Sequence, residues 1–252
     1  MGKVIDNKYF EASVQDNLAI VSLKSEAFEL ITSITESQVM MDFIRDAEHD
    51  PAVRGLLLLN RPDCLGEQAY DRFIRSILAE DESLDKKDVP TFLEKNVRFR
   101  QINILNRFIR FLAGYHKLVI AGIGCTIVTP FMGVAMVADI RLASPYGSFS
   151  LAHRKYGLHP SGGIPFFLTH YLGHSKALEL QLSDRITAEE AFRFGLVNQI
   201  LPADHFPENC ARYVQSYLNH YRSTLSTTKR LNNFKNRWLE EYQKHEGSLI
   251  NL

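Results

Sequence analysis

The sequence contains no charged residue between Leu118 and Ala138. An uncharged, mostly apolar stretch of this length can cross a bilayer as a helix. Glycines, threonines and Pro130 interrupt the stretch, however, and they favour a buried strand at 118–123, a turn, and a buried helix that starts near Pro130. We therefore expect a chain with a large apolar core and no membrane-spanning segment.

The flanking stretches predict an α/β fold. Residues 9–23 alternate between polar and apolar side chains on both sides of Asp16 and Asn17, which indicates a β-hairpin. The unbroken apolar run at 55–59 is typical of a strand covered on both faces, as in a parallel sheet. Helices are predicted at 36–48, 93–114, 187–194, 204–221 and 224–246, and a further strand at 139–144. Strands and helices thus alternate through a core at 1–200, and a helical C-terminal extension at 201–252 follows.

Charge and composition restrict the functional classes. Lysine plus arginine balance aspartate plus glutamate at 29 each, and the pI is about 7.1, so a broad basic face for nucleic acid is not expected. The segment 227–244 is basic with interleaved aromatic residues, a pattern that RNA-binding helices share. An amphipathic helix that packs on its own domain or on a neighbouring subunit explains the same pattern.

The cysteines and the N-terminal residues suggest a reduced, cytoplasmic protein. Cys64, Cys125 and Cys210 lie far apart and form no CxxC pair, which argues against a zinc ribbon or a disulfide framework. The N-terminal residues lack the apolar region of a secretory signal.

Residues 79–90 are dense in charge and end at a proline, which predicts an exposed loop.

Two places gather groups that could carry chemistry. Thr129 suits a helix N-cap and Pro130 suits the first helical position. A helix start can bind negative charge through free backbone N–H groups, although a proline removes one of them. His153 stands beside Arg154 and Lys155, whose charges would lower its pKa and favour the neutral imidazole that a base requires.

Other motifs are weaker. Tyr156 and His159 join His153 in the densest polar cluster next to the Gly-rich loop 159–163. His170 and His174 lie four residues apart, but no carboxylate or third ligand accompanies them, so no metal site is expected. The chain has neither a GxSxG elbow nor a GxGxxG fingerprint, which leaves serine hydrolases and Rossmann dehydrogenases without support.

Residues 117–202 resemble the enoyl-CoA hydratase/isomerase, or crotonase, superfamily. The pattern of that family runs K-P-V-I-A-A, a Gly-rich turn, D-I-R-x-A, F, G-L and P-x-G-G, and then three further motifs ending in G-L-V-x-x-V-x-P. This sequence matches it at Lys117, Ala121, Asp139, Ile140, Ala143, Phe149, Gly157, Pro160, Gly162, Gly163, Gly173, Ala177, Glu190, Ala191, Gly195, Leu196, Val197 and Pro202. Residues 50–60 resemble an earlier strand of the family. Several matched positions are packing glycines, so they indicate the fold more than the activity.

The resemblance implies a spiral of ββα units with a C-terminal helical region, assembled as a trimer or hexamer. It also implies a coenzyme A thioester as ligand or substrate, with no resident cofactor. The thioester carbonyl would lie between two backbone N–H donors that stabilise an enolate-like intermediate. The first donor position falls at Gly66 and Glu67, and the second at Pro130, or at Phe131 if the alignment shifts by one residue.

The sequence departs from the family at the positions that hydration requires. The first catalytic glutamate of a hydratase aligns with Gly133 and the second with His153, and Pro130 has no N–H to donate. Enoyl hydration uses carboxylates to position water and to move its proton, so a conventional hydratase is not expected.

Two main interpretations remain open. In the first, His153 or Glu67 acts as base or acid on an acyl-CoA in isomerisation, hydrolysis or decarboxylation. Gly133, Tyr156 and His159 then line the substrate pocket, and Lys24 contacts coenzyme A. In the second, the chain keeps the fold as a catalytically inactive binding or assembly protein, and Glu67 is a surface residue. Binding of RNA by the C-terminal helix is a third alternative, and neither nucleic acid nor a membrane is an expected partner.

Overall fold

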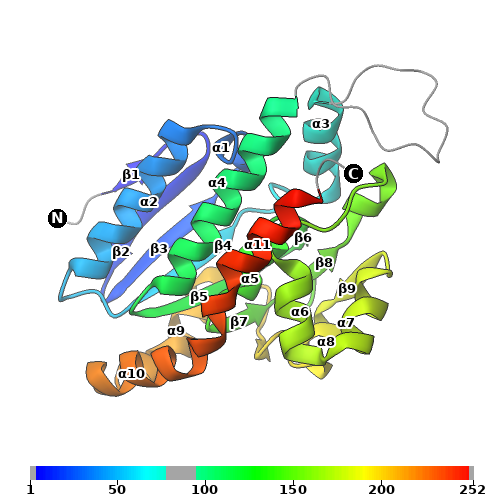
Figure 1. Cartoon of the computed structure of the whole chain (residues 1–252). Coiled ribbons are helices and arrows are strands. Elements are labelled where there is room, and N and C mark those ends of the chain that lie inside the picture. The colour runs from blue at the N-terminus through cyan, green and yellow to red at the C-terminus, as the bar shows by residue number, and fades with distance from the viewer. Residues whose placement is uncertain (1–3, 78–94, 250–252) are drawn as a thin grey trace.

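The computed structural model describes residues 4–77 and 95–249, and its centre is a mixed sheet (Figure 1). The antiparallel hairpin predicted around Asp16 forms β2 and β3. In this sheet β3, β4, β5, β7 and β10 run parallel to one another, and β1 pairs antiparallel with β2. In spatial order the strands are β1 (Ile5–Asp6), β2 (Phe10–Gln15), β3 (Leu18–Leu23), β4 (Gly55–Asn60), β5 (Leu118–Ile123), β7 (Ile140–Ala143) and β10 (Gln199–Ile200). The α/β class and the hairpin are therefore confirmed.

The central strands are buried because helices cover both faces of the sheet. β4 pairs in parallel with β3 and β5, and Leu56 and Leu57 are fully buried, as the unbroken apolar run predicts. The helices α2 (Ile34–His49) and α4 (Lys95–Gly114) lie over one face (Figure 1). On the other face, α9 (Phe206–Leu218) packs its apolar side against β4 and β5. Burial on both sides of the sheet makes these strands the rigid base of the molecule.

A smaller sheet stands beside the main one and organises the polar residues. It consists of β6 (Thr126–Val128), β8 (Ser148–Ser150) and β9 (Arg185–Thr187). The helix α3 (Glu67–Ile77) packs on β6, and the 3₁₀ helix η1 (Ala152–Tyr156) follows β8 directly. The short helix α5 (Met132–Met136) follows β6.

The remaining elements are helical. They are α1 (Ala27–Leu30), α6 (Ile164–Leu172), α7 (His174–Gln181), α8 (Ala188–Arg193), α10 (Arg222–Asn232), the 3₁₀ helix η2 (Asn233–Trp238) and α11 (Leu239–Ser248). After β10 the described chain contains helices alone, and α11 returns to pack on α4 (Figure 1). The predicted C-terminal helical region is confirmed, whereas the domain boundary at 200 and the role of this region in subunit packing stay predictions.

Some details differ from the sequence expectations. The helix after the uncharged strand begins at Met132 with Phe131 at its N-cap, so the prediction of Thr129 as N-cap and Pro130 as first helical residue was wrong. The Thr129–Pro130 peptide bond is cis, and the Thr129 hydroxyl faces His153 instead of the helix. The charged segment 79–90 lies outside the described residues. Across residues 4–77 and 95–249, no helix is both long enough and apolar enough to span a membrane.

Candidate functional site

Two candidate catalytic residues, His153 and Glu67, belong to one connected polar cluster. The Thr129 hydroxyl lies 2.8 Å from His153 Nδ1 and 3.4 Å from the carbonyl oxygen of Ser150. The Ser150 hydroxyl donates to Glu67 Oε1 at 2.9 Å. Because β6 and β8 pair side by side, residues that are distant in sequence meet at their ends. The fold thus links the two candidates through Thr129 and Ser150.

Glu67 is the first residue of α3 and carries a stable negative charge. Its Oε1 accepts from Arg185 Nη2 at 2.8 Å, and its Oε2 is paired with Lys155. The hydrogen bond from Lys155 is the largest cause that lowers the pKa of Glu67, to about 2. Burial opposes it as the next largest cause, and the hydrogen bonds from Arg185 and Ser150 add to the lowering. A carboxylate held this far below neutrality is a poor proton donor at pH 7, and it can accept hydrogen bonds.

A polar cleft of about 410 Å³ opens at this cluster. Arg154, Lys155 and Arg185 line it together with the carboxylates of Glu67 and Asp184. Asp184 accepts from Arg154 at 3.0 Å, so each carboxylate already has a cationic partner. With three cations against two carboxylates, the cleft has an excess of positive charge and is suited to an anionic group of a ligand.

His153 is buried, with 3% of its surface exposed. Burial lowers its pKa to about 4, and the charges of His159, Arg154 and Arg98 add to the effect. The expectation that a cationic neighbour lowers this pKa is therefore correct for Arg154, although burial is the larger cause and Lys155 is not among the causes. The imidazole is neutral at pH 7, but its basicity is well below that of an ordinary histidine.

Two of the positions expected to donate to a thioester carbonyl have no free backbone N–H in the described structure. Pro130 has no N–H, and the N–H of Gly66 donates to Asp63 O within a turn at 3.4 Å. Phe131 is 3% exposed, and its ring contacts that of Phe28 at a centroid distance of 5.2 Å. The ring of Phe131 is therefore part of the apolar core.

Gly133, the position that the sequence resemblance assigns to the first hydratase glutamate, lies against the Gly-rich loop. A Cβ atom placed on Gly133 would come within 1.9 Å of the Gly162 carbonyl oxygen. Any side chain at this position, including that of glutamate, would require the backbone of one of the two segments to move.

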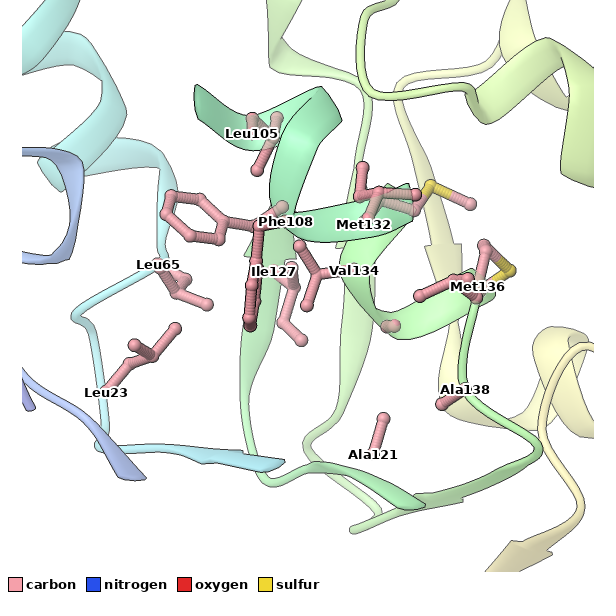
Figure 2. Close-up of a cluster of buried hydrophobic side chains, with 14 of the residues drawn as sticks. Leu23, Leu65, Leu105, Phe108, Ala121, Ile127, Met132, Val134, Met136 and Ala138 are labelled. Atoms are coloured by element: carbon pink, nitrogen blue, oxygen red, sulfur yellow. The ribbon is translucent and has the colours of Figure 1, made fainter. Parts of the chain in front are cut away.

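The apolar space beside α5 is almost filled. Cavities of about 30 Å³ and about 10 Å³ share Leu23 and Phe131 in their walls, and the larger has room for no more than about two water molecules. In Figure 2, Leu23, Leu65 and Ile127 lie among the packed side chains that border this space. An acyl chain would enter only after side chains moved.

The other predicted residues have partners elsewhere. The Tyr156 hydroxyl donates to Asp71 at 2.7 Å, and His159 Nδ1 lies 3.0 Å from Pro160 O. Neither these two residues nor Gly133 line the cleft or the two apolar cavities in the described part of the chain. Lys24 pairs with Asp6 and donates to Asn7 O at 2.8 Å, at the edge of the sheet.

Sequence analysis missed a buried carboxylate on α11. Glu246 is 3% exposed and accepts from the N–H groups of Gly162 at 2.9 Å and Gly163 at 3.0 Å. Burial raises its pKa to about 7, although the two N–H groups favour its charged form. Since Gly162 also lies against Gly133, Glu246 fixes the loop that closes over the start of α5.

Ser150 and Arg185 were also missed. Ser150 occupies an alternating strand pattern that predicts only its local structure, and Arg185 is 118 residues from Glu67 in sequence. No local signal could have joined them. Within residues 4–77 and 95–249, no group of three or more histidines, cysteines or acidic residues is arranged to hold a metal ion.

Comparison with known proteins identifies the class. The family model of enoyl-CoA hydratase/isomerase matches residues 104–249. The chain is 27% identical over 210 residues to probable enoyl-CoA hydratase echA12 of Mycobacterium bovis, covering 82% of this chain and 68% of that protein. It is 24% identical over 183 residues to 4-chlorobenzoyl coenzyme A dehalogenase-1 of an Arthrobacter species, covering 68% and 66%. The structure of enoyl-CoA hydratase from Bacillus halodurans superimposes with a TM-score of 0.76 at 19% identity, covering 96% of this chain and 93% of that one.

The fold is therefore that of the crotonases, as the sequence resemblance predicts. The chain belongs to the enoyl-CoA hydratase/isomerase family.

Proposed function

We propose that this protein binds an acyl-CoA thioester and does not act as a conventional hydratase. The observation that carries the proposal is the contact between Gly133 and Gly162, which leaves no space for a glutamate at the first hydratase position. The second position holds His153, a neutral and weakly basic group. Water activation by a pair of carboxylates is thus absent from these two positions.

The polar cleft supports an anionic ligand. Coenzyme A carries phosphate groups, and the excess of arginine and lysine in the cleft favours them or a carboxylate on the acyl chain. If the protein is an enzyme, His153 accepts or donates a proton near the thioester, and Glu67 holds Lys155 and Arg185 in place. The reaction would then be an isomerisation, hydrolysis or decarboxylation of the acyl-CoA.

The alternative is a binding or assembly protein without catalysis. It is favoured by the missing N–H at Pro130 and by apolar cavities of only about 30 and 10 Å³. In this alternative the ligand regulates or stabilises the protein and is not converted.

Calorimetric titration with coenzyme A and a panel of acyl-CoA thioesters tests the proposal. We expect saturable binding with a preference among acyl groups, together with thermal stabilisation by the bound ligand. Turnover that disappears in His153→Ala while thioester affinity persists would support the enzyme. The matched control is His170→Ala, because His170 lies on α6, where its Nδ1 is 2.7 Å from Phe166 O and its ring packs on that of Phe166, and it does not line the cleft. No binding of any thioester would contradict the proposal.

We also propose a cytoplasmic homotrimer or hexamer in which the C-terminal helices form subunit contacts. Tyr221, Leu231 and Phe234 are 85%, 72% and 63% exposed, which is unusual for apolar side chains that share one region. Light scattering coupled to size exclusion measures the assembly. A monomer at micromolar concentration would contradict this part of the proposal.

A further inference from the structure

A second polar cavity, of about 160 Å³, lies beyond the end of α5 that is farther from Thr129. Val137 and Ala138 border it where α5 ends. Arg141 enters from β7, Tyr171 from α6, and Lys235 from η2. The cavity therefore joins the core to the C-terminal helices, away from the cleft at Glu67.

Two cations lie against the same aromatic ring in this cavity. The guanidinium carbon of Arg141 is 4.8 Å from the ring centre of Tyr171, and Lys235 Nζ is 4.3 Å from it. Arg141 is 5% exposed and donates to the carbonyl oxygens of Leu196 at 2.5 Å and Ala138 at 2.6 Å. These carbonyl groups satisfy N–H donors but carry no negative charge.

The local carboxylate is already neutralised. Asp139 lines the cavity, but its Oδ2 is paired with Lys229 Nζ at 2.7 Å and accepts from the Val119 N–H at 2.8 Å. Within residues 4–77 and 95–249, no carboxylate lies at ion-pair distance from Arg141 or Lys235. Burial and the charge of Arg141 accordingly lower the pKa of Lys235. A bound anion would offset the repulsion between the positive charges of Arg141 and Lys235.

One buried acceptor in the wall also lacks a partner. Asn236 Oδ1 is inaccessible to solvent and has no hydrogen-bond donor in the described part of the chain. A buried acceptor without a donor destabilises the protein. Asn236 lines the cavity, so a rotation of its side chain would bring this oxygen to a ligand that carries an O–H or N–H group. The cavity thus combines two unpaired cations with one unpaired acceptor.

We propose that this cavity is a binding site for a compact oxyanion that carries its own hydroxyl donor, as hydrogen phosphate does. Arg141 and Lys235 hold the charged oxygens, and Asn236 Oδ1 accepts the P–OH proton. Arginine is suited to phosphate because its planar N–H groups match the oxygens in direction. The inference is independent of the thioester proposal, since it concerns other residues at the other end of α5.

Titration calorimetry and thermal melting with sodium phosphate at pH 7 test the site. Chloride and sulfate at matched ionic strength are the comparison salts, because sulfate has the charge but no hydroxyl at this pH. We expect saturable phosphate binding, with sulfate weaker and chloride without effect. Lys235→Gln should weaken phosphate binding by about tenfold or more. Lys244→Gln, an exposed lysine on α11 paired with Glu240, should leave it unchanged.

Asn236→Asp gives a second and opposite test. The new carboxylate would stand in the wall of the same cavity as Arg141 and Lys235, and its negative charge should oppose a bound anion, so we expect loss of phosphate binding. A melting temperature no lower than that of the unmodified protein would show that misfolding does not explain the lost binding.

Several outcomes would overturn the site. Equal stabilisation by phosphate and chloride would indicate general salt screening, and equal affinities of Lys235→Gln and Lys244→Gln would remove the role of Lys235. Displacement of phosphate by coenzyme A would assign the cavity to the thioester ligand. Absence of phosphate binding together with dissociation of an oligomer in Lys235→Gln would assign it to a carboxylate of a second copy.

Discussion

Glu67 and Glu246 are carboxylates in two regions that meet the same segment, residues 129–133, from different directions. Glu67 reaches it through Ser150, whose carbonyl oxygen accepts from Thr129. Glu246 reaches it through Gly162, which lies against Pro130 and Gly133. In the open cleft, Lys155 lowers the pKa of Glu67 to about 2, whereas burial raises that of Glu246 to about 7. The environment therefore gives one carboxylate an electrostatic role and the other a structural role that depends on pH.

The largest effect is expected where the Glu246 region closes on α5. Gly133→Ala places a Cβ atom within 1.9 Å of the Gly162 carbonyl oxygen, so the backbone must shift. We expect a loss of more than about 3 kcal/mol in the free energy of unfolding, measured by urea denaturation. Gly114→Ala at the end of α4 is the control, since no heavy atom lies within 4 Å of its new Cβ. Similar stability of the two variants would show that the loop yields without strain.

The next effect concerns the carboxylate itself. Glu246→Ala leaves the buried N–H groups of Gly162 and Gly163 without an acceptor, which should cost about 2–5 kcal/mol of folding stability. Glu246→Gln retains one acceptor and should lose roughly half as much. Glu240→Ala, at an exposed position on the same helix, should melt like the unmodified protein. A Glu246→Ala variant with the same melting temperature as Glu240→Ala would contradict the structural role of Glu246.

The pH dependence of stability separates the two regions. The pKa of Glu246 is raised in the folded protein from 4.5 to about 7, so the folded state binds more protons than the unfolded state in this range. Its contribution to stability is therefore present below pH 4.5 and is lost as the pH rises through about 7, by at most about 3 kcal/mol. Denaturation of the wild type and of Glu246→Gln at pH 5 and pH 8 measures it. If the free energy of unfolding changed equally between pH 5 and pH 8 in both proteins, the assignment of this pH dependence to Glu246 would be contradicted.

Glu67 has the opposite sign and a smaller effect. Its pKa is lowered from 4.5 to about 2, so its contribution is present above pH 4.5 and is lost as the pH falls through about 2. Because solvent screens its ion pairs, Glu67→Gln should change stability at pH 7 by less than about 1 kcal/mol. Freed from their partner, Lys155 and Arg185 should bind anions of the thioester more tightly in calorimetry. Weaker binding would mean that Glu67 touches the ligand directly.

The local structure of this protein was largely readable from its sequence. The alternation around Asp16, the apolar run at 55–59 and the helical spacing at 93–114 predict elements that the structure contains. The start of α5 was misplaced because the Thr–Pro signal for a helix start is also compatible with a turn before the helix, where Thr129 bonds to His153. The polar candidates His153 and Glu67 were found, but their shared network was not.

Sequence periodicity predicted the α/β class and the buried strands, because side-chain spacing along a strand or helix is a local property. The family was indicated separately, by the motif resemblance of residues 117–202. Tertiary structure alone decided the charge state of the site. Arg185 and Glu67 are 118 residues apart, and Glu246 and Gly162 are 84 apart. The pKa values of these groups depend on which atoms lie nearby and on how much water they exclude, and neither is encoded in the spacing of neighbours along the chain. For the same reason, the close contact of Gly133 with Gly162 and the unpaired cations at Arg141 and Lys235 became visible only in the folded protein.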